Sequence, residues 1–216
     1  TDNLALTAVS GTTASNYTIT YSNGSLIINP IVVHLSGNAI YNGTNTFAIS
    51  SSGSSLVVAN AVGGSSVTVS GSATMAGVNV GTQNLVSMNG LSLSNSNYTL
   101  SGAVGSVNVI AAPLGISVTG TYSGTTTIVP VANGYTLTGL VGNDTVTSIT
   151  AVTVNNPNVS ANSSNYITNI LIGGGTATMS NYLINSGRNS AVNSTNTNLI
   201  TINPAPLTIS AQNAVK

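Results

Sequence analysis

Hydrophobic and polar residues alternate along much of the chain. Residues 66–70 read SVTVS and residues 114–118 read LGISV, and the same period of two recurs at 135–138, 152–154 and 207–210. A period of two that is rich in β-branched residues is typical of strands that bury one face. The pattern therefore predicts an all-β protein built from many short strands.

Turn signals separate the alternating runs. Asn-Gly pairs occur at 42–43, 89–90 and 133–134, and a Gly-Gly pair occurs at 63–64. Asn and Gly both tolerate the positive φ angles that tight hairpin turns need. Short strands with a turn every 8–12 residues or so favour a sandwich or a barrel. We expect tandem Ig-like β-sandwich repeats, with small β-grasp-like modules as the alternative.

The chain also repeats itself. The tetrapeptide SNYT at 15–18 returns at 96–99, and YNGT at 41–44 returns as YSGT at 122–125, both 81 residues later. One offset for matches spread along the chain indicates a true repeat. We take the following recurring positions as its structural motif: Asn16, Tyr17, Tyr41, Gly43, Thr44, Asn97, Tyr98, Tyr122, Gly124 and Thr125.

A looser match and two tripeptides mark the boundaries of the repeats. Residues 62–68 match residues 141–147 at an offset of 79, INP at 28–30 returns at 202–204, and APL at 112–114 returns at 205–207. Four prolines fall at these boundaries and fix φ there, which predicts stiff joints. The joint prolines are Pro30, Pro113, Pro204 and Pro206.

These boundaries divide the chain into four parts. Residues 1–30 are the C-terminal part of a preceding repeat, 31–111 a complete repeat, 112–204 a longer complete repeat, and 205–216 the first strand of a following repeat or a donor strand. The added length lies within 155–200, where two Asn-Tyr pairs, at 165–166 and 181–182, compete for the motif position. A repeat of about 80–90 residues can hold its own core, so we expect an elongated string of modules.

Several of these stretches resemble the YDG/MBG repeats of large bacterial surface adhesins, including filamentous-haemagglutinin-like exoproteins secreted by the two-partner route. The matching stretches are residues 41–47, 71–75, 96–99, 122–128, 137–147 and 202–209. The family has an Asp after the motif tyrosine, where this chain has Asn42 and Ser123. The resemblance implies extracellular stalk or adhesin modules without enzymatic activity.

Charge is nearly absent. Only four residues are charged, namely Asp2, Asp144, Arg188 and Lys216, and the chain has no Glu and no Cys. A paired-carboxylate hydrolase, a Ca²⁺ cage and a Cys/His zinc site therefore lack their atoms. Two cations are too few for nucleic-acid binding, and no stretch reaches the roughly 18 apolar residues of a membrane helix. We expect no enzyme, no cofactor, no metal, no nucleic-acid partner and no membrane insertion.

The few ionisable residues suit structural roles. His34 alternates with Val33 and Leu35, which predicts a side chain on the solvent face of a strand. Asp144 lies in a Gly-Asn-Asp-Thr turn, where an Asp side chain commonly bonds its own backbone. Arg188 and Lys216 are each alone in sequence and are expected on solvated surface.

An uncharged β surface leaves strand edges unguarded, and unguarded edges pair with other chains. We therefore expect a structural module of an extracellular or cell-surface adhesin stalk, matrix fibre or filament. It would act by stacking of repeats and by strand addition, with neighbouring repeats or identical subunits as partners. The alternative is a module that binds polysaccharide or a host or abiotic surface through surfaces lined by Tyr and Asn.

Overall fold

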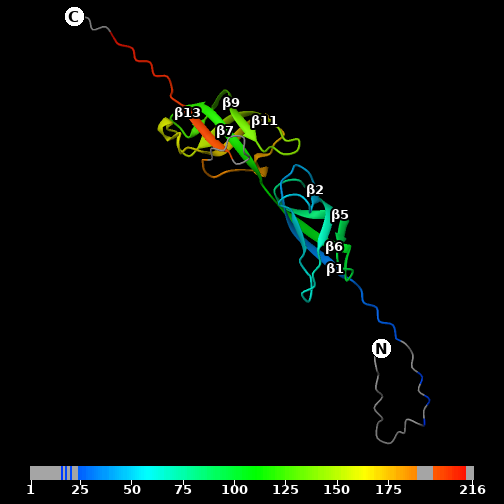
Figure 1. The fold of residues 1–216 in the computed structure, drawn as a ribbon. Coiled ribbons are helices and arrows are strands. Elements are labelled where there is room, and N and C mark those ends of the chain that lie inside the picture. The colour runs from blue at the N-terminus through cyan, green and yellow to red at the C-terminus, as the bar shows by residue number, and fades with distance from the viewer. Residues whose placement is uncertain (1–15, 17, 19, 21–23, 189–196, 213–216) are drawn as a thin grey trace.

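The computed structural model describes residues 16, 18, 20, 24–188 and 197–212 (Figure 1). Strands dominate the described residues, and the helical elements among them are short 3-10 turns. The all-β prediction is therefore confirmed. The strands gather in two lobes that follow one another along one axis (Figure 1), and we call these lobes module 1 and module 2.

Module 1 is a single curled sheet of six strands. The strand order is β2-β4-β5-β6-β1-β3, so that the first and last strands of the module lie side by side. These two strands run parallel, whereas the other neighbours are antiparallel. The strands are β1 (Ile31–Ile40), β2 (Thr46–Ala48), β3 (Ser55–Val58), β4 (Val69–Met75), β5 (Gly81–Leu93) and β6 (Tyr98–Ile110).

Module 2 follows the same plan in two pieces. One piece has the order β11-β10-β8, and in the other β7 pairs with β12, β13 and β9. Strand β7 runs parallel to β12 and β13 and antiparallel to β9. The elements are β7 (Ala112–Thr121), β8 (Thr127–Ile128), β9 (Pro130–Thr138), β10 (Val146–Val154), η2 (Val159–Ala161), β11 (Ile167–Gly175), η3 (Met179–Asn181), β12 (Tyr182–Ile184) and β13 (Asn198–Asn203).

Strand register places the longer segment of module 2. Tyr98 pairs with Ile31 at the start of β1, and Tyr182 pairs with Ala112 at the start of β7. The pair at 181–182 therefore occupies the motif position of the pair at 97–98. In module 1 the strand β6 bulges between Thr99 and Val104. In module 2 the corresponding stretch runs from β12 to β13 and is longer by several residues.

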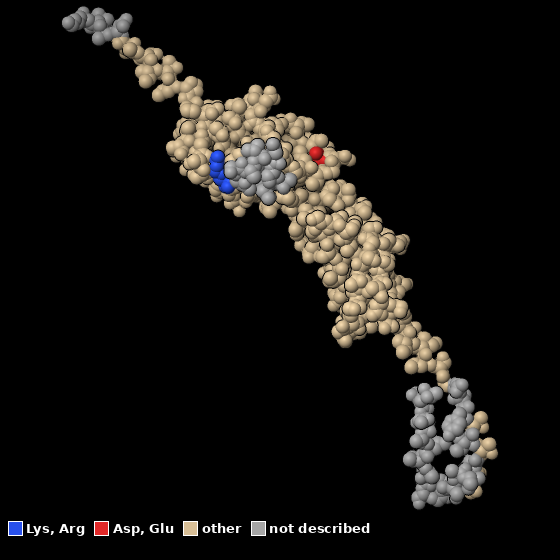
Figure 2. Space-filling model, in the orientation of Figure 1, with Lys and Arg blue, Asp and Glu red and all other residues tan. Residues whose placement is uncertain are grey.

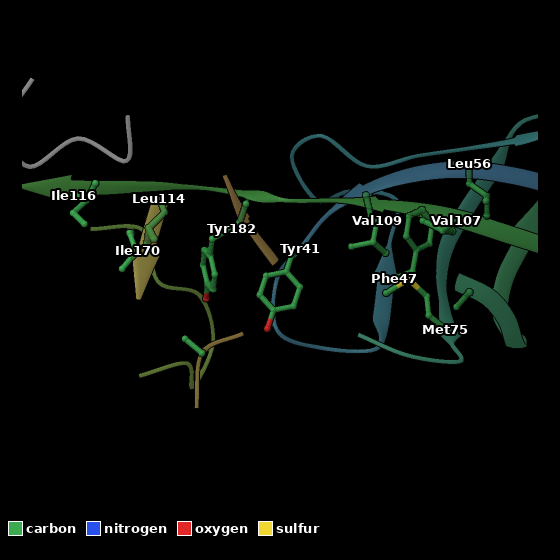
Figure 3. Packing of buried hydrophobic residues seen from close by; sticks show 14 of the residues in the cluster. Tyr41, Phe47, Leu56, Met75, Val107, Val109, Leu114, Ile116, Ile170 and Tyr182 are labelled. Carbon is green, nitrogen blue, oxygen red and sulfur yellow. The ribbon is translucent and has the colours of Figure 1, made fainter. Parts of the chain in front are cut away.

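Each core follows the alternation of the sequence. On β1, Val33 and Leu35 are buried while His34 between them is exposed, as the sequence predicts. Most side chains of strand β7 are buried, including Leu114, Ile116 and Val118. Figure 3 shows the two cores, with Phe47 and Met75 in module 1 and Leu114 and Ile116 in module 2.

Candidate functional site

The two modules are joined by one continuous extended segment. Strand β6 ends at Ile110, β7 begins at Ala112, and a single residue separates them. Figure 3 shows the ribbon passing from one core to the other without a loop. Pro113 fixes its own φ and disfavours the helical conformation at Ala112, so the backbone at the joint is held extended.

Two tyrosines and one carboxylate connect the modules beneath this strand. Tyr41 of module 1 and Tyr182 of module 2 both donate their hydroxyl protons to Oδ2 of Asp144, over 2.9 Å and 2.6 Å. The two rings meet edge to face with centroids 5.5 Å apart and an interplanar angle of 80° (Figure 3). Hydrogen bonds to an ionised acceptor are about twice as strong as neutral ones. We call this pair of hydrogen bonds the latch.

Each latch residue is held in place by backbone hydrogen bonds. Tyr41 follows β1 directly, and its N–H donates to the carbonyl of Ile110 over 2.8 Å. Asp144 closes a turn in which its N–H donates to Val141 O over 3.1 Å. The N–H of Val141 donates in turn to the hydroxyl of Tyr182, also over 3.1 Å. The Asp144 turn expected from the sequence is present, but the side chain reaches the two tyrosines.

Burial and the contact with Asp144 raise the pKa of both tyrosines above the ordinary value of 10.0. For Tyr41 the main cause is burial, followed by its hydrogen bond to Asp144 and the charge of that carboxylate. For Tyr182 burial again leads, followed by the hydrogen bond to Asp144. A tyrosinate beside a carboxylate would be repelled, so both hydroxyls stay protonated and act as donors.

A buried amide makes a second contact across the joint. Asn181 is 1% exposed. Its Oδ1 accepts the backbone N–H of Val80 over 3.0 Å, and its Nδ2 donates to Oδ1 of Asn79 over 2.9 Å. Asn79 and Val80 lie between β4 and β5 of module 1, so Asn181 adds a second set of hydrogen bonds between the two modules.

Two glycines bring the backbones of the modules together. Gly43 has φ of 75° and Gly142 has φ of 58°, both in the left-handed region that favours glycine. A Cβ at Gly43 would lie 3.6 Å from the Cα of Gly142 and 3.6 Å from the carbonyl oxygen of Val141. A single added carbon at Gly43 would therefore already be in van der Waals contact with the backbone of module 2.

The other motif residues lie in turns and at module ends. Asn42 Oδ1 accepts the N–H of Thr44 over 3.0 Å, and Ser123 and Thr125 bond each other in the equivalent turn. The Tyr98 hydroxyl accepts the N–H of Val62 over 3.0 Å. Asn16, Asn97, Tyr122 and Gly124 are exposed, and Tyr17 lies outside the described residues.

The prolines mark the module ends. Pro30 precedes β1, Pro113 is the second residue of β7, and Pro204 and Pro206 follow β13. Asp144 and Arg188 are the charged residues in the described part of the chain, and the face drawn in Figure 2 carries little charge. Within the described residues no group of three or more His, Cys, Asp or Glu is placed to hold a metal. Arg188 donates to the carbonyl of Asn162, and Asp2 and Lys216 lie outside the described residues.

Sequence reasoning missed three residues of the joint, namely Asp144 as an acceptor, Asn79 and Asn181. Of these, only Asn79 had a signal in the sequence, namely the offset of 79 that relates residues 62–68 to 141–147. At the same offset, Asn79-Val80 returns as Asn158-Val159. The role of such a pair cannot be predicted from the sequence, because it depends on which residues the pair contacts in the fold.

Comparison with known proteins assigns one part of the chain. Residues 30–105 match the YDG domain, so this stretch forms a YDG-type module. The match begins at the joint proline before β1 and ends within β6. No curated protein and no solved structure matches the chain. In the part of the chain that the structure describes, no helix has the length and apolarity to cross a membrane.

Proposed function

We propose that this chain, whose residues 30–105 form a YDG-type module, is a load-bearing structural segment of an extracellular stalk or fibre. The observation that carries the proposal is the parallel pairing of the first and last strands in each module. Strand β1 lies beside β6, and β7 lies beside β13. The chain therefore enters a module at one end of a parallel pair and leaves it at the opposite end.

This arrangement resists stretching along the chain. A pull on Ile31 and Ile110 acts on opposite ends of the β1–β6 ladder, whose register runs from Ile31↔Tyr98 to Ile40↔Ile110. The hydrogen bonds between the strands then carry the load together, because none can open before the strands slide past each other. The β7–β13 pair in module 2 is loaded in the same way.

The joint passes tension from one module to the next. Since β6 continues into β7 with one residue between them, no slack loop has to be taken up. The latch of Tyr41, Asp144 and Tyr182 and the Asn181 contacts keep the modules aligned. A segment with stiff joints and sheared ladders suits a stalk that holds something away from a surface.

The parallel pair also favours one of the two expected fold types. An Ig-like sandwich packs two antiparallel sheets face to face. Module 1 instead keeps its six strands in one curled sheet with a parallel pair inside it. We therefore propose that the modules are closer to the β-grasp-like alternative. An extracellular or bacterial cell-surface location, in an adhesin, matrix fibre or filament, is part of the same proposal and rests on the family resemblance.

The polysaccharide alternative finds less support in the described tyrosines. A sugar platform needs an exposed ring face, yet Tyr41, Tyr98 and Tyr182 are buried. Among the described tyrosines only Tyr122 is clearly exposed, at 40%. One exposed ring offers little area for stacking.

Self-association by strand addition belongs to the proposal as well. In the described parts of the flanking segments, Leu26, Ile28, Leu207 and Ile209 are largely exposed. Their repeat partners Val107, Val109, Leu114 and Ile116 are buried in strands. Addition of such a strand to the edge of another sheet would bury these apolar side chains and stabilise the assembly. The mass of the chain in solution, measured over a range of concentrations, tests this route.

Single-molecule stretching tests the load-bearing role. Anchors at Ile31→Cys and Ile110→Cys in the full chain would shear the β1–β6 ladder. Anchors at Ile40→Cys and Ile110→Cys, which are partners at the same end of that ladder, would peel it bond by bond. The chain has no native cysteine, so each pair of anchors is unique. We expect the shear geometry to need the higher force, whereas equal forces would contradict the proposal.

A further inference from the structure

We infer that the two outer ends of this pair of modules are half-joints, each built to dock a further module of the same kind through the contacts seen at the central joint. The inference rests on the proposed stalk function and deepens it by naming the docking residues. Each module has two ends. The front face is the end at which its first strand begins, and the rear face is the end at which its last strand finishes. At the central joint the rear face of module 1 meets the front face of module 2.

The rear face of module 2 repeats the rear face of module 1. Tyr122 follows β7 and donates its N–H to the carbonyl of Asn203 over 2.9 Å, just as Tyr41 donates to Ile110 over 2.8 Å. Tyr41 is 5% exposed at the central joint, whereas Tyr122 is 40% exposed. The Asn158-Val159 pair, the counterpart of Asn79-Val80 at an offset of 79, lines the same hollow as Tyr122. The same side chains thus lie at an uncovered end.

The front face of module 1 repeats the front face of module 2. The hydroxyl of Tyr98 accepts the N–H of Val62, as the hydroxyl of Tyr182 accepts that of Val141. The following turn closes with a bond from Ser65 N–H to Val62 O over 3.0 Å, which matches the Asp144 turn. Asn97, the counterpart of buried Asn181, is exposed.

The backbone at both outer ends already has the conformation of the joint. Gly124 has φ of 78° against 75° for Gly43, and Gly63 has φ of 61° against 58° for Gly142. At the joint Gly43 and Gly142 are in contact with each other's backbone. A Cβ added at Gly124 or Gly63 would meet nothing within 4 Å. Turns of the same conformation therefore face open space at the outer ends.

A hollow lies at each of these ends. On the rear face of module 2 a hollow of about 530 Å³ is lined by Tyr122, Asn158, Val159 and the two prolines after β13. On the front face of module 1 a hollow of about 250 Å³ is lined by Val62, Ser65, Asn97 and Tyr98. These residues are the counterparts of the joint residues, so each hollow marks the place that the neighbouring face fills at the central joint.

The latch acceptor differs between the outer front face and the central one. Ser65 stands at the position of Asp144, so a module docked there would bring its tyrosine to a hydroxyl instead of a carboxylate. Hydrogen bonds between neutral groups are weaker than those to an ionised acceptor. We therefore expect this docking to be weaker than the central joint and to be strengthened by Ser65→Asp.

A fused chain tests the inference. Because INP occurs both at 28–30 and at 202–204, residues 1–204 can be followed directly by residues 31–216 without changing the sequence around the new joint. Val86 and Leu171 are exposed strand positions in module 1 and module 2 and can carry spin labels as cysteines. Labels at Leu171 of the first copy and Val86 of the second report on the new joint. Labels at Val86 and Leu171 of one copy report on the central joint.

The expected result is one narrow distance distribution across each joint. Tyr122→Ala in the first copy should broaden the distribution at the new joint, whereas Tyr135→Ala, within the sheet of the same module, should not. Ser65→Asp in the second copy should narrow the distribution at the new joint. Because this variant is expected to strengthen docking, its effect cannot come from a loss of folding. A broad distribution at the new joint with a narrow one at the central joint would overturn this inference alone. Broad distributions at both joints would overturn the stalk proposal and this inference together.

Chemical modification distinguishes the occupant. If a module fills the rear hollow, Tyr122 of the first copy should be protected from nitration, while the same residue in the second copy should react. Equal nitration of Tyr122 in both copies would overturn the inference. Tyr122 would then be available to bind another partner, such as a polysaccharide.

Discussion

At the scale of single residues, one carboxylate organises the joint. Asp144 is the only acidic residue in the described part of the chain, and it accepts both Tyr41 and Tyr182. Its sequence context indicated the turn correctly. It could not indicate the acceptor role, because Tyr41 lies 103 residues away in sequence and the period of a strand says nothing about such a distance. By contrast, the outward orientation of His34 followed from alternation alone.

Replacement of Asp144 should weaken the joint in a graded way. Asp144→Asn keeps an oxygen acceptor but loses its charge, and should cost about 1 kcal/mol of unfolding free energy. Asp144→Ala leaves two tyrosine hydroxyls without their acceptor, and should cost about 2 kcal/mol. Urea denaturation measures both, with Asn143→Ala at the exposed neighbouring position as the control. Equal stability of all three variants would show that the latch contributes nothing.

The tyrosines give the joint a dependence on high pH. Their folded pKa values are raised above the ordinary 10.0, so above about pH 10 the unfolded chain releases protons that the folded chain retains. The stabilisation is complete below that pH and is lost as pH rises through the folded pKa values. We expect the unfolding free energy to fall above about pH 10, and to fall less steeply in Tyr41→Phe. Identical slopes in the two proteins would contradict this assignment.

The contact between glycines predicts a difference between equivalent positions. Gly43→Leu and Gly124→Leu meet the same unfavourable φ, of 75° and 78°. Only the side chain at position 43 would also collide with module 2, since Gly142 lies in contact there and nothing lies near Gly124. Gly43→Leu should therefore lower the melting temperature more than Gly124→Leu does, as differential scanning calorimetry would show. A larger loss at Gly124 would argue against close contact at the joint.

At the scale of elements, the segment β6–β7 matters most. The sequence predicted the strands from their alternation and placed Pro113 at a joint. It could not show that β1 lies beside β6, because a period of two indicates which face is buried but not which strand pairs with which. The position of the longer segment of module 2 was likewise open until the pairing of Tyr182 with Ala112 showed which Asn-Tyr pair belongs to the motif.

Insertion into the connecting segment should separate the modules without unfolding them. Two glycines after Ala111 would shift Tyr41 away from Asp144 and relax the extended backbone, since glycine adds conformational freedom. The same insertion after Ser52, in an exposed turn of module 1, serves as the control. We expect the first variant to unfold in two separate transitions and the control to keep the coupling of the parent chain. Coupled unfolding in the first variant would contradict the role of the continuous strand.

At the scale of the whole molecule, the structure is an elongated pair of modules with almost no surface charge (Figure 2). The low charge of the sequence predicts no metal site, no nucleic-acid partner and no acid–base chemistry. The structure adds a positive meaning, because Asp144, the single acidic residue described, lies at the joint. The resemblance to YDG repeats is confirmed over residues 30–105, which match the YDG domain. Because residues of the joint recur at both outer faces, we infer that further modules dock there in the same way.

The central claim is that the two modules form one stiff unit, and the distance between them tests it most directly. Spin labels at Val86→Cys and Leu171→Cys in the full chain allow that distance to be measured by double electron–electron resonance. We predict a single narrow distribution in the parent chain, and a broad one when Tyr41→Phe is combined with Asp144→Ala. A broad distribution in the parent chain itself would contradict the claim.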